Sequence, residues 1–137
     1  MAVYTKINQT EIKIIENKFN VGKILSFSGI KKGIENTNYL LKTKNEKFIL
    51  TIFEKRVSNK EIPFFMKLMD NLNQSKISCP KPLKDKNGNY LFKLKNKTAC
   101  VVTFLKGKDK KVLNTNNCYQ VGKIISKMHS ITKKLKF

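Results

Sequence analysis

Arginine is almost absent from this sequence, although the chain is strongly basic. Of 137 residues, 29 are lysine or arginine and 9 are acidic, giving a formal net charge of +20, yet Arg56 is the only arginine. Sites that read nucleic-acid sequence or clamp phosphate favour the planar, two-pronged guanidinium of arginine. The lysines accompany abundant asparagine and isoleucine, the composition that AT-rich codons produce. We therefore expect most lysines to lie on solvated faces. We also expect that the protein has no sequence-specific nucleic-acid partner.

Cysteine and long apolar runs are also scarce. Cys79, Cys100 and Cys118 are too few and too widely spaced for a disulfide framework or a paired-cysteine metal site. Residues 1–15 lack the apolar segment of a signal peptide, and no stretch approaches the roughly 18 apolar residues of a membrane span. We therefore expect a cytoplasmic protein with no membrane partner.

Groups that could catalyse a reaction are few. Asp70, Asp85 and Asp109 are the only aspartates, and none stands in a pattern typical of a catalytic loop or a metal-binding pair. His129 is the only histidine, and its place in an apolar helical repeat predicts a packed side chain, not a catalytic one. We assign no catalytic residue and no metal ligand within this chain.

Length and apolar content favour one folded domain, because a chain of this size can remove roughly two-thirds of its unfolded surface from water. The apolar periodicity predicts a helix, three strands, a helix, two strands, a linker and a helix. That order is typical of an α+β fold with an antiparallel sheet of about five strands. The predicted elements are a helix capped by Thr10 and ending near 20–22, strands over 23–30, 37–43 and 47–54, a helix within 58–77 that begins nearer Ile62 than Ser58, a hairpin turn at Asn87–Gly88, a strand over 98–107 and a helix from Thr115 to Thr132.

The loop between the first two strands could carry chemistry. Its sequence, SGIKKGIENTNY, offers two glycines, neutral side-chain donors and two lysines. In a kinase-type small lobe such a loop covers nucleotide phosphates, because small residues let backbone N–H groups approach the phosphate oxygens. The spacing matches no established phosphate-loop motif, so the spacing alone favours an ordinary hairpin, and a phosphate-covering loop stays open at this point.

The residues resemble a known family along essentially the whole chain. They are similar, in order and spacing, to the N-terminal part of bacterial homoserine kinases, which belong to the superfamily of aminoglycoside phosphotransferases and choline kinases. The most specific segments are GIENTNYLL and FILTIFEKR followed by PFF. The other matching segments are AVYTKI, EIPFFMKLMDNL, CPKPL, VVTFLKG and VGKIISKMHSI.

The resemblance implies a protein-kinase-like N-terminal lobe over 1–105, followed over 106–137 by the hinge linker and the first helix of a C-terminal lobe. It implies that the family phosphorylates the side-chain hydroxyl of L-homoserine with ATP and Mg²⁺, giving O-phosphohomoserine, a step toward threonine. Leu50 and Ile52 would line or support the adenine pocket. The ATP-binding residues implied are Gly33, Glu35, Asn36, Thr37 and Asn38 near the phosphates, Thr51 and Lys55 from the third strand, and Thr103, Phe104 and Leu105 in the hinge.

One position departs from the wider kinase pattern. The third strand of many kinases carries a lysine that pairs with the phosphates and with a helix glutamate. The comparable residue here is Thr51, and Lys55 follows four residues later. A Lys55–Glu61 pair and two separately solvated charges both stay open.

The resemblance covers less than half of a family member. Its catalytic loop and magnesium ligands would lie beyond Phe137, so we expect the 137 residues alone to be an inactive fragment that needs a C-terminal lobe. We expect the last helix to expose Ile124, Ile125 or Met128, and one of Phe64 and Phe65 to face that lobe while the other packs in the core. A small basic protein that binds RNA or ribosomes is the alternative hypothesis.

Overall fold

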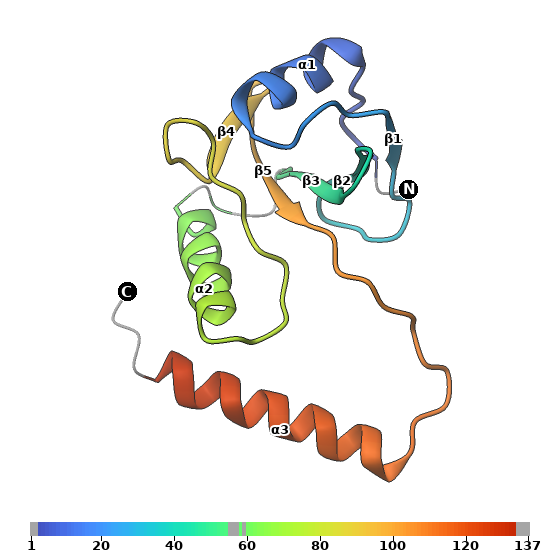
Figure 1. The fold of residues 1–137 in the computed structure, drawn as a ribbon, viewed down its shortest axis with the longest axis vertical. Helices are drawn as coiled ribbons and strands as arrows, with labels where there is room; N and C mark the ends of the chain where they lie inside the picture. Colours follow the sequence, from blue (N-terminus) through green and yellow to red (C-terminus); the bar gives the residue numbers. More distant parts are fainter. Residues whose placement is uncertain (1–2, 55–57, 59, 134–137) are drawn as a thin grey trace.

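The computed structural model describes residues 3–54, 58 and 60–133. Five antiparallel strands form a single sheet, with the spatial order β1-β2-β3-β5-β4. One helix packs on each face of this sheet, and a third lies apart at the end of a long linker (Figure 1). The elements are α1 (Gln9–Lys18), β1 (Ser26–Gly29), β2 (Thr37–Lys42), β3 (Lys47–Ile52), α2 (Ile62–Gln74), β4 (Leu91–Leu94), β5 (Lys97–Thr103) and α3 (Thr115–Thr132). The predicted α+β class with a five-stranded antiparallel sheet is confirmed.

The two faces of the sheet have different roles. Successive residues of a strand point to opposite faces, so alternate positions of β2 and β3 separate into two sets. Leu41, Leu50 and Ile52 are fully buried on the face that α1 covers. Thr51 lies between Leu50 and Ile52 in sequence, so its side chain points to the other face. It pairs with Asn38 on β2 and with Cys100 on β5. The sheet therefore buries its main core on the α1 side, and it presents the row of Asn38, Thr51 and Cys100 toward α2.

The core on the α1 side fixes the sheet. Ile12 and Ile15, one turn apart on α1, are almost completely buried against the strands. Phe19, just after the helix, meets Phe92 of β4 edge to face, with ring centroids 5.2 Å apart. These contacts tie the start of the chain to the strand at the far edge of the sheet.

Asn8, not Thr10, caps the first helix. The Asn8 side chain accepts a hydrogen bond from Thr10 N at 2.7 Å, and Glu11 accepts one from Asn8 N at 2.8 Å. The Asn8 side chain also accepts from the Glu11 backbone, which completes a capping box and starts the helix before the predicted position. At α2 the first helical residue is Ile62, as predicted, with Pro63 in the first turn where its missing N–H costs nothing.

The predicted hairpin turn is displaced. Asn87 and Gly88 do form a turn, with Gly88 at φ +84°, but it closes a loop that Asp85 holds by accepting from the amides of Asn87 and Asn89. The turn between β4 and β5 is instead Lys95–Asn96, with both residues at positive φ. A two-residue hairpin needs that backbone geometry, which asparagine tolerates better than most residues.

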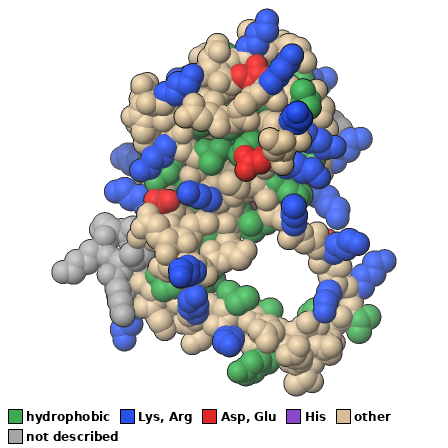
Figure 2. Space-filling model, in the orientation of Figure 1, with side chains coloured by type: hydrophobic (Ala, Val, Ile, Leu, Met, Phe, Trp, Pro, Cys, Tyr) green, Lys and Arg blue, Asp and Glu red, His purple; other side chains and the backbone are tan. Residues whose placement is uncertain are grey.

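The third helix lies outside the two-sided core. Residues 104–114 form an extended connection, and none of the α3 residues is buried. Figure 2 shows an opening bounded by this linker, α3 and the rest of the molecule. None of the described helices is long and apolar enough to cross a membrane.

The exposure of α3 confirms one expectation and corrects another. Ile124 and Ile125 are 52% and 45% exposed, as expected, and Met128 is half-buried. His129 is exposed, so the prediction of a packed histidine is wrong. Among the described elements α3 approaches α2, where Lys127 reaches the carbonyl of Lys76, so the His129 side of the helix meets solvent.

Candidate functional site

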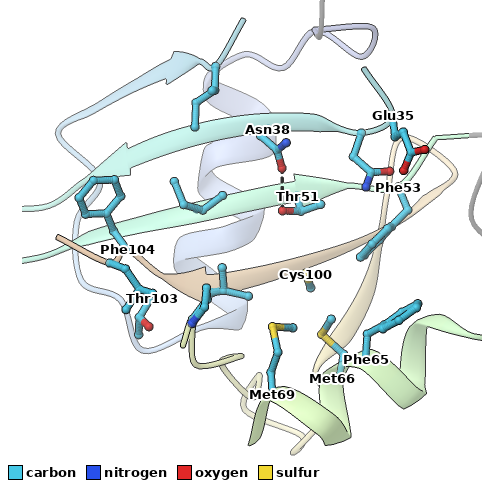
Figure 3. A pocket seen from close by; sticks show the side chains of 16 residues that line it. Glu35, Asn38, Thr51, Phe53, Phe65, Met66, Met69, Cys100, Thr103 and Phe104 are labelled. Atoms are coloured by element: carbon cyan, nitrogen blue, oxygen red, sulfur yellow. Dashed lines mark hydrogen bonds between the residues drawn. The ribbon is translucent and has the colours of Figure 1, made fainter. Parts of the chain in front are cut away.

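A cavity of about 680 Å³ lies between the face of the sheet that looks toward α2, α2 itself and the start of the linker. Figure 3 shows side chains from β2, β3, β5 and α2 pointing into it. Its volume is within the usual range for sites that hold small molecules. The lining residues are Ile30, Glu35, Asn36, Asn38, Ile49, Thr51, Phe53, Phe65, Met66, Met69, Pro80, Cys100, Val102, Thr103, Phe104 and Leu105.

One end of the cavity is an apolar slot. Ile49 and Val102, on neighbouring strands β3 and β5, are directly paired and form its floor. Met66 and Met69 project from α2 toward that floor (Figure 3). Methionine is unbranched and polarisable, so it adapts well to a flat ring. The slot therefore suits a planar, largely apolar group.

The other end of the cavity is polar and carries side-chain amides. Thr51 Oγ1 donates to Asn38 Oδ1 at 2.8 Å, a bond marked in Figure 3, which directs the Asn38 amide hydrogens elsewhere. Asn36 Oδ1 accepts from Glu54 N at 3.4 Å, which orients the Asn36 amide in the same way. Neither arginine nor lysine is among the described residues that line the cavity. Amide donors at this end could bind anionic oxygens through hydrogen bonds.

The backbone where β5 leads into the linker is held in place on both sides. Thr103 N donates to Lys81 O at 2.9 Å, and Lys81 N donates to Thr103 Oγ1 at the same distance. Phe104 N donates to Lys47 O at 3.1 Å. Within the described residues no hydrogen bond is found for the Leu105 N–H, and Leu105 lines the cavity.

Most residues that the resemblance implied for ATP do come together here. Seven of them line the cavity: Glu35, Asn36, Asn38, Thr51, Thr103, Phe104 and Leu105. Gly33 has φ +110° and is exposed in the loop, outside the lining. Lys55 lies outside the described residues, so its pairing with Glu61 stays a prediction.

Three other residues lie on the opposite side of the sheet. Thr37 is fully buried there, and its hydroxyl oxygen accepts from Tyr4 N and Thr5 N at 2.9 and 3.1 Å. Leu50 and Ile52 are buried in the α1 core, so they support the cavity floor from behind and do not line it. The alternation of strand residues explains all three, since Asn38 and Thr51 occupy the cavity side.

Several lining residues were not singled out from the sequence. Once Thr51 faces the cavity, the two-residue period of β3 also places Ile49 and Phe53 there. Met66 and Met69 share one side of α2 with Phe65, which the helical period could have indicated.

The two adjacent phenylalanines differ from expectation. Phe64 and Phe65 are 40% and 43% exposed, so neither is a core residue. Their rings meet edge to face at 5.6 Å, and Phe65 lines the cavity. The prediction that one of them packs in the core is wrong.

A half-buried ionic cluster of Glu54, Lys97, Thr5 and Thr37 lies behind the polar end of the cavity. The Glu54 carboxylate pairs with Lys97 and accepts from Thr5 Oγ1 and Thr37 Oγ1, both at 2.7 Å. Burial is the strongest single influence and raises the pKa of Glu54, but the hydrogen bonds from Lys97, Thr37 and Thr5 together outweigh it, so the pKa lies below its ordinary value. The carboxylate is therefore ionised at neutral pH, and it fixes the end of β3 beside Asn36.

Reactive and metal-binding groups are sparse in the described part of the chain. Burial raises the pKa of the Cys100 thiol to about 12, so this cavity residue stays protonated and is a poor nucleophile. No group of three histidine, cysteine or acidic side chains within the described residues could hold a metal ion. The cavity as described offers a binding surface.

Comparison with known proteins places the chain in a family. Residues 26–136 match the phosphotransferase enzyme family. The chain belongs to this family. Homoserine kinases from Beijerinckia indica subsp. indica and Bartonella tribocorum are 39% and 38% identical to it over 129 residues. These alignments cover 94% of this chain and 40% of each relative, so the chain is a partial-length relative of homoserine kinases, as the resemblance implied.

The fold of this phosphotransferase-family chain also matches solved structures. Spectinomycin phosphotransferase in complex with ADP and spectinomycin has a TM-score of 0.70 at 14% identity, covering 96% of this chain and 42% of that one. Its AMP-bound complex gives a TM-score of 0.66 at 16% identity, with the same coverage. At these identities the match concerns the fold, and it lies in the N-lobe region of the kinase.

Proposed function

We propose that this chain is the nucleotide-binding part of a homoserine kinase, which transfers a phosphoryl group from ATP to the side-chain hydroxyl of L-homoserine in threonine biosynthesis. The observation that carries the proposal is the cavity, whose apolar slot and amide-lined end lie in a chain 39% identical to a homoserine kinase. The ADP and AMP named in the matching spectinomycin phosphotransferase structures support a nucleotide as the ligand. Residues 1–105 would form the nucleotide-binding lobe, and 106–137 would start the second lobe.

In this proposal each end of the cavity binds a different part of ATP. Adenine enters between Ile49 and Val102 on one side and Met69 on the other, and the Leu105 N–H donates to its edge. The phosphates extend toward Asn36 and Asn38. The side-chain amides of these residues are uncharged, and they donate hydrogen bonds to the phosphate oxygens. Support comes from the fixed backbone at Thr103 and from the Thr51–Asn38 hydrogen bond, which orient these groups before the ligand arrives.

The second lobe is proposed to supply what the described residues do not carry. Val121, Ile124 and Ile125 follow a helical repeat on one side of α3, and each is at least 45% exposed. Such an apolar stripe is typical of a helix that packs against another element. We propose that a C-terminal lobe covers it, bears the catalytic carboxylate and the Mg²⁺ ligands, and completes the homoserine site. A cytoplasmic location, expected from the sequence, stays a prediction.

The alternative is a protein that binds RNA through its lysines. Lysine side chains are spread over the visible face of the molecule and do not gather in one patch (Figure 2). A spread of single charges is typical of a solvated surface, whereas RNA-binding proteins concentrate theirs along one face. The nucleotide proposal is therefore favoured.

Calorimetric titration of the 137-residue chain with ATP tests the proposal. Met69→Trp places an indole in the slot, so we expect ATP affinity to fall at least tenfold. The matched control is Lys67→Trp, the same new side chain on the exposed side of α2, which should bind like wild type. Thermal melting of both variants checks that the fold is intact.

Two outcomes would contradict the proposal. One is a wild-type chain that shows no ATP binding, and the other is a Met69→Trp variant that binds as tightly as wild type. Repeating the titrations with a short RNA at 50 and 200 mM salt tests the alternative. Binding through lysine–phosphate contacts would weaken steeply over that range.

A further inference from the structure

The start of the chain lies against the loop that borders the polar end of the cavity. We refer to Val3–Thr5 as the N-terminal strap and to residues 30–36 as the β1–β2 loop. The Tyr4 hydroxyl donates to the Ile34 carbonyl at 3.0 Å, a contact that joins residues thirty positions apart. The strap runs beside β1 and β2, close to the loop (Figure 1).

The strap also meets both ends of the loop. Before the loop, the Val3 side chain fills the space above Gly29, where an added Cβ would lie 2.8 Å from Val3 Cγ2. After the loop, Thr37 Oγ1 accepts from the backbone N–H groups of Tyr4 and Thr5. The strap therefore contacts the chain before, within and after the loop.

The strap is itself held by the half-buried ionic cluster. The Thr5 hydroxyl donates to Glu54 and accepts from Lys97 Nζ, both at 2.7 Å. Glu54 N donates to Asn36, so the same residue also fixes the last position of the loop. Thr5 and Thr37 are 7% and 0% exposed, whereas Tyr4 is 56% exposed. The anchored part of the strap is thus buried, and the Tyr4 ring extends from it to the loop.

Glu35 and Asn36 line the cavity directly after Ile34, the residue whose carbonyl Tyr4 binds. A displacement of the Ile34 carbonyl would therefore move the Glu35 and Asn36 side chains at the polar end of the cavity. We propose that Tyr4 is a positioning residue for nucleotide binding, which holds the β1–β2 loop in the conformation that covers the phosphates. This inference rests on the proposed function, and Tyr4 acts through the loop without touching the ligand.

Tyr4→Phe removes the hydroxyl and leaves the ring, and Tyr119→Phe makes the same change on α3, far from the loop. Amide hydrogen exchange of the ligand-free 137-residue chain is the first measurement. In Tyr4→Phe we expect faster exchange over residues 30–36 and unchanged exchange over β3. Tyr119→Phe should match wild type throughout. Equal exchange over 30–36 in Tyr4→Phe and wild type would overturn the proposal.

The second measurement compares ATP with adenosine, which lacks phosphates. We expect Tyr4→Phe to bind ATP about three- to tenfold more weakly, the range of one hydrogen bond, and to bind adenosine like wild type. Equal weakening for both ligands, or none for ATP, would refute the positioning role. A wild-type chain that binds no ATP refutes the proposed function itself, and the positioning role falls with it, whatever the exchange pattern.

Discussion

Lys97→Met is expected to destabilise the chain in a pH-dependent way, because it removes the only cation that the structure places on the Glu54 carboxylate within the described residues. The Glu54 side chain is 10% exposed and that of Lys97 is 39% exposed. Breaking a fully buried pair costs about 3–5 kcal/mol, and the solvent around Lys97 reduces that figure. The Thr5 and Thr37 hydroxyls still donate to the carboxylate. We expect a loss of about 1–2 kcal/mol at neutral pH.

The sign of the pH dependence follows from the lowered pKa of Glu54. A carboxyl whose pKa is lower in the folded state stabilises the fold above its unfolded pKa, and the contribution is lost as pH falls through the folded pKa. The ordinary value for this group is 4.5. The difference between wild type and Lys97→Met should therefore be full at pH 7 and should shrink at pH values below 4.5.

Urea denaturation at pH 7 and pH 3.5 measures both effects. Lys93→Met is the matched control, since Lys93 is exposed on the neighbouring strand and bonds to Thr98 rather than to a carboxylate. We expect it to change stability by less than about 0.5 kcal/mol. A Lys97→Met variant with the same loss at both pH values, or with a loss no larger than the control, would refute the role of the cluster.

Two further predictions concern packing and the link between α2 and β4. Gly29→Ala should destabilise the chain by about 1–3 kcal/mol, because the added Cβ would lie 2.8 Å from Val3 Cγ2. Gly107→Ala places its Cβ in open space and should be nearly neutral. Equal melting temperatures for the two variants would contradict this packing. Tyr90→Phe should cost about 1 kcal/mol by removing the 2.8 Å bond from the Tyr90 hydroxyl to Asp70. Burial, and secondly Asp70, raise the pKa of Tyr90 from 10 to about 12. The stabilisation by the Tyr90 hydroxyl should therefore be full below pH 10 and should fall toward pH 12. A difference in urea midpoint between wild type and Tyr90→Phe that grows over that range would contradict this pH dependence.

Much of the fold could be predicted because periodicity reports burial. The alternation in β2 and β3 and the helical repeat in α2 each bury one set of side chains and expose another, which the sequence pattern shows directly. The turn chemistry was less informative. Asn87–Gly88 is the stronger hairpin signal, but Asp85 uses its carboxylate to close a separate loop there, and Lys95–Asn96 makes the hairpin.

The cavity was predicted in part, for a reason that Thr37 and Asn38 illustrate. The family resemblance implied that both residues lie near the phosphates. Neighbouring residues on a strand point to opposite faces, however, so only Asn38 lines the cavity. His129 shows a different limit. Its helical repeat was correctly predicted, but the contact that would bury it depends on what packs against α3, and helical periodicity cannot supply that.

The central claim is that ATP binds in the cavity between the sheet, α2 and the linker. Chemical-shift mapping of the isotope-labelled 137-residue chain with ATP tests it most directly. We predict the largest amide shifts at Thr51, Val102 and Leu105, with little change when salt is raised. Shifts confined to lysine-rich segments outside the cavity and abolished by salt, or no shifts at all, would contradict the account.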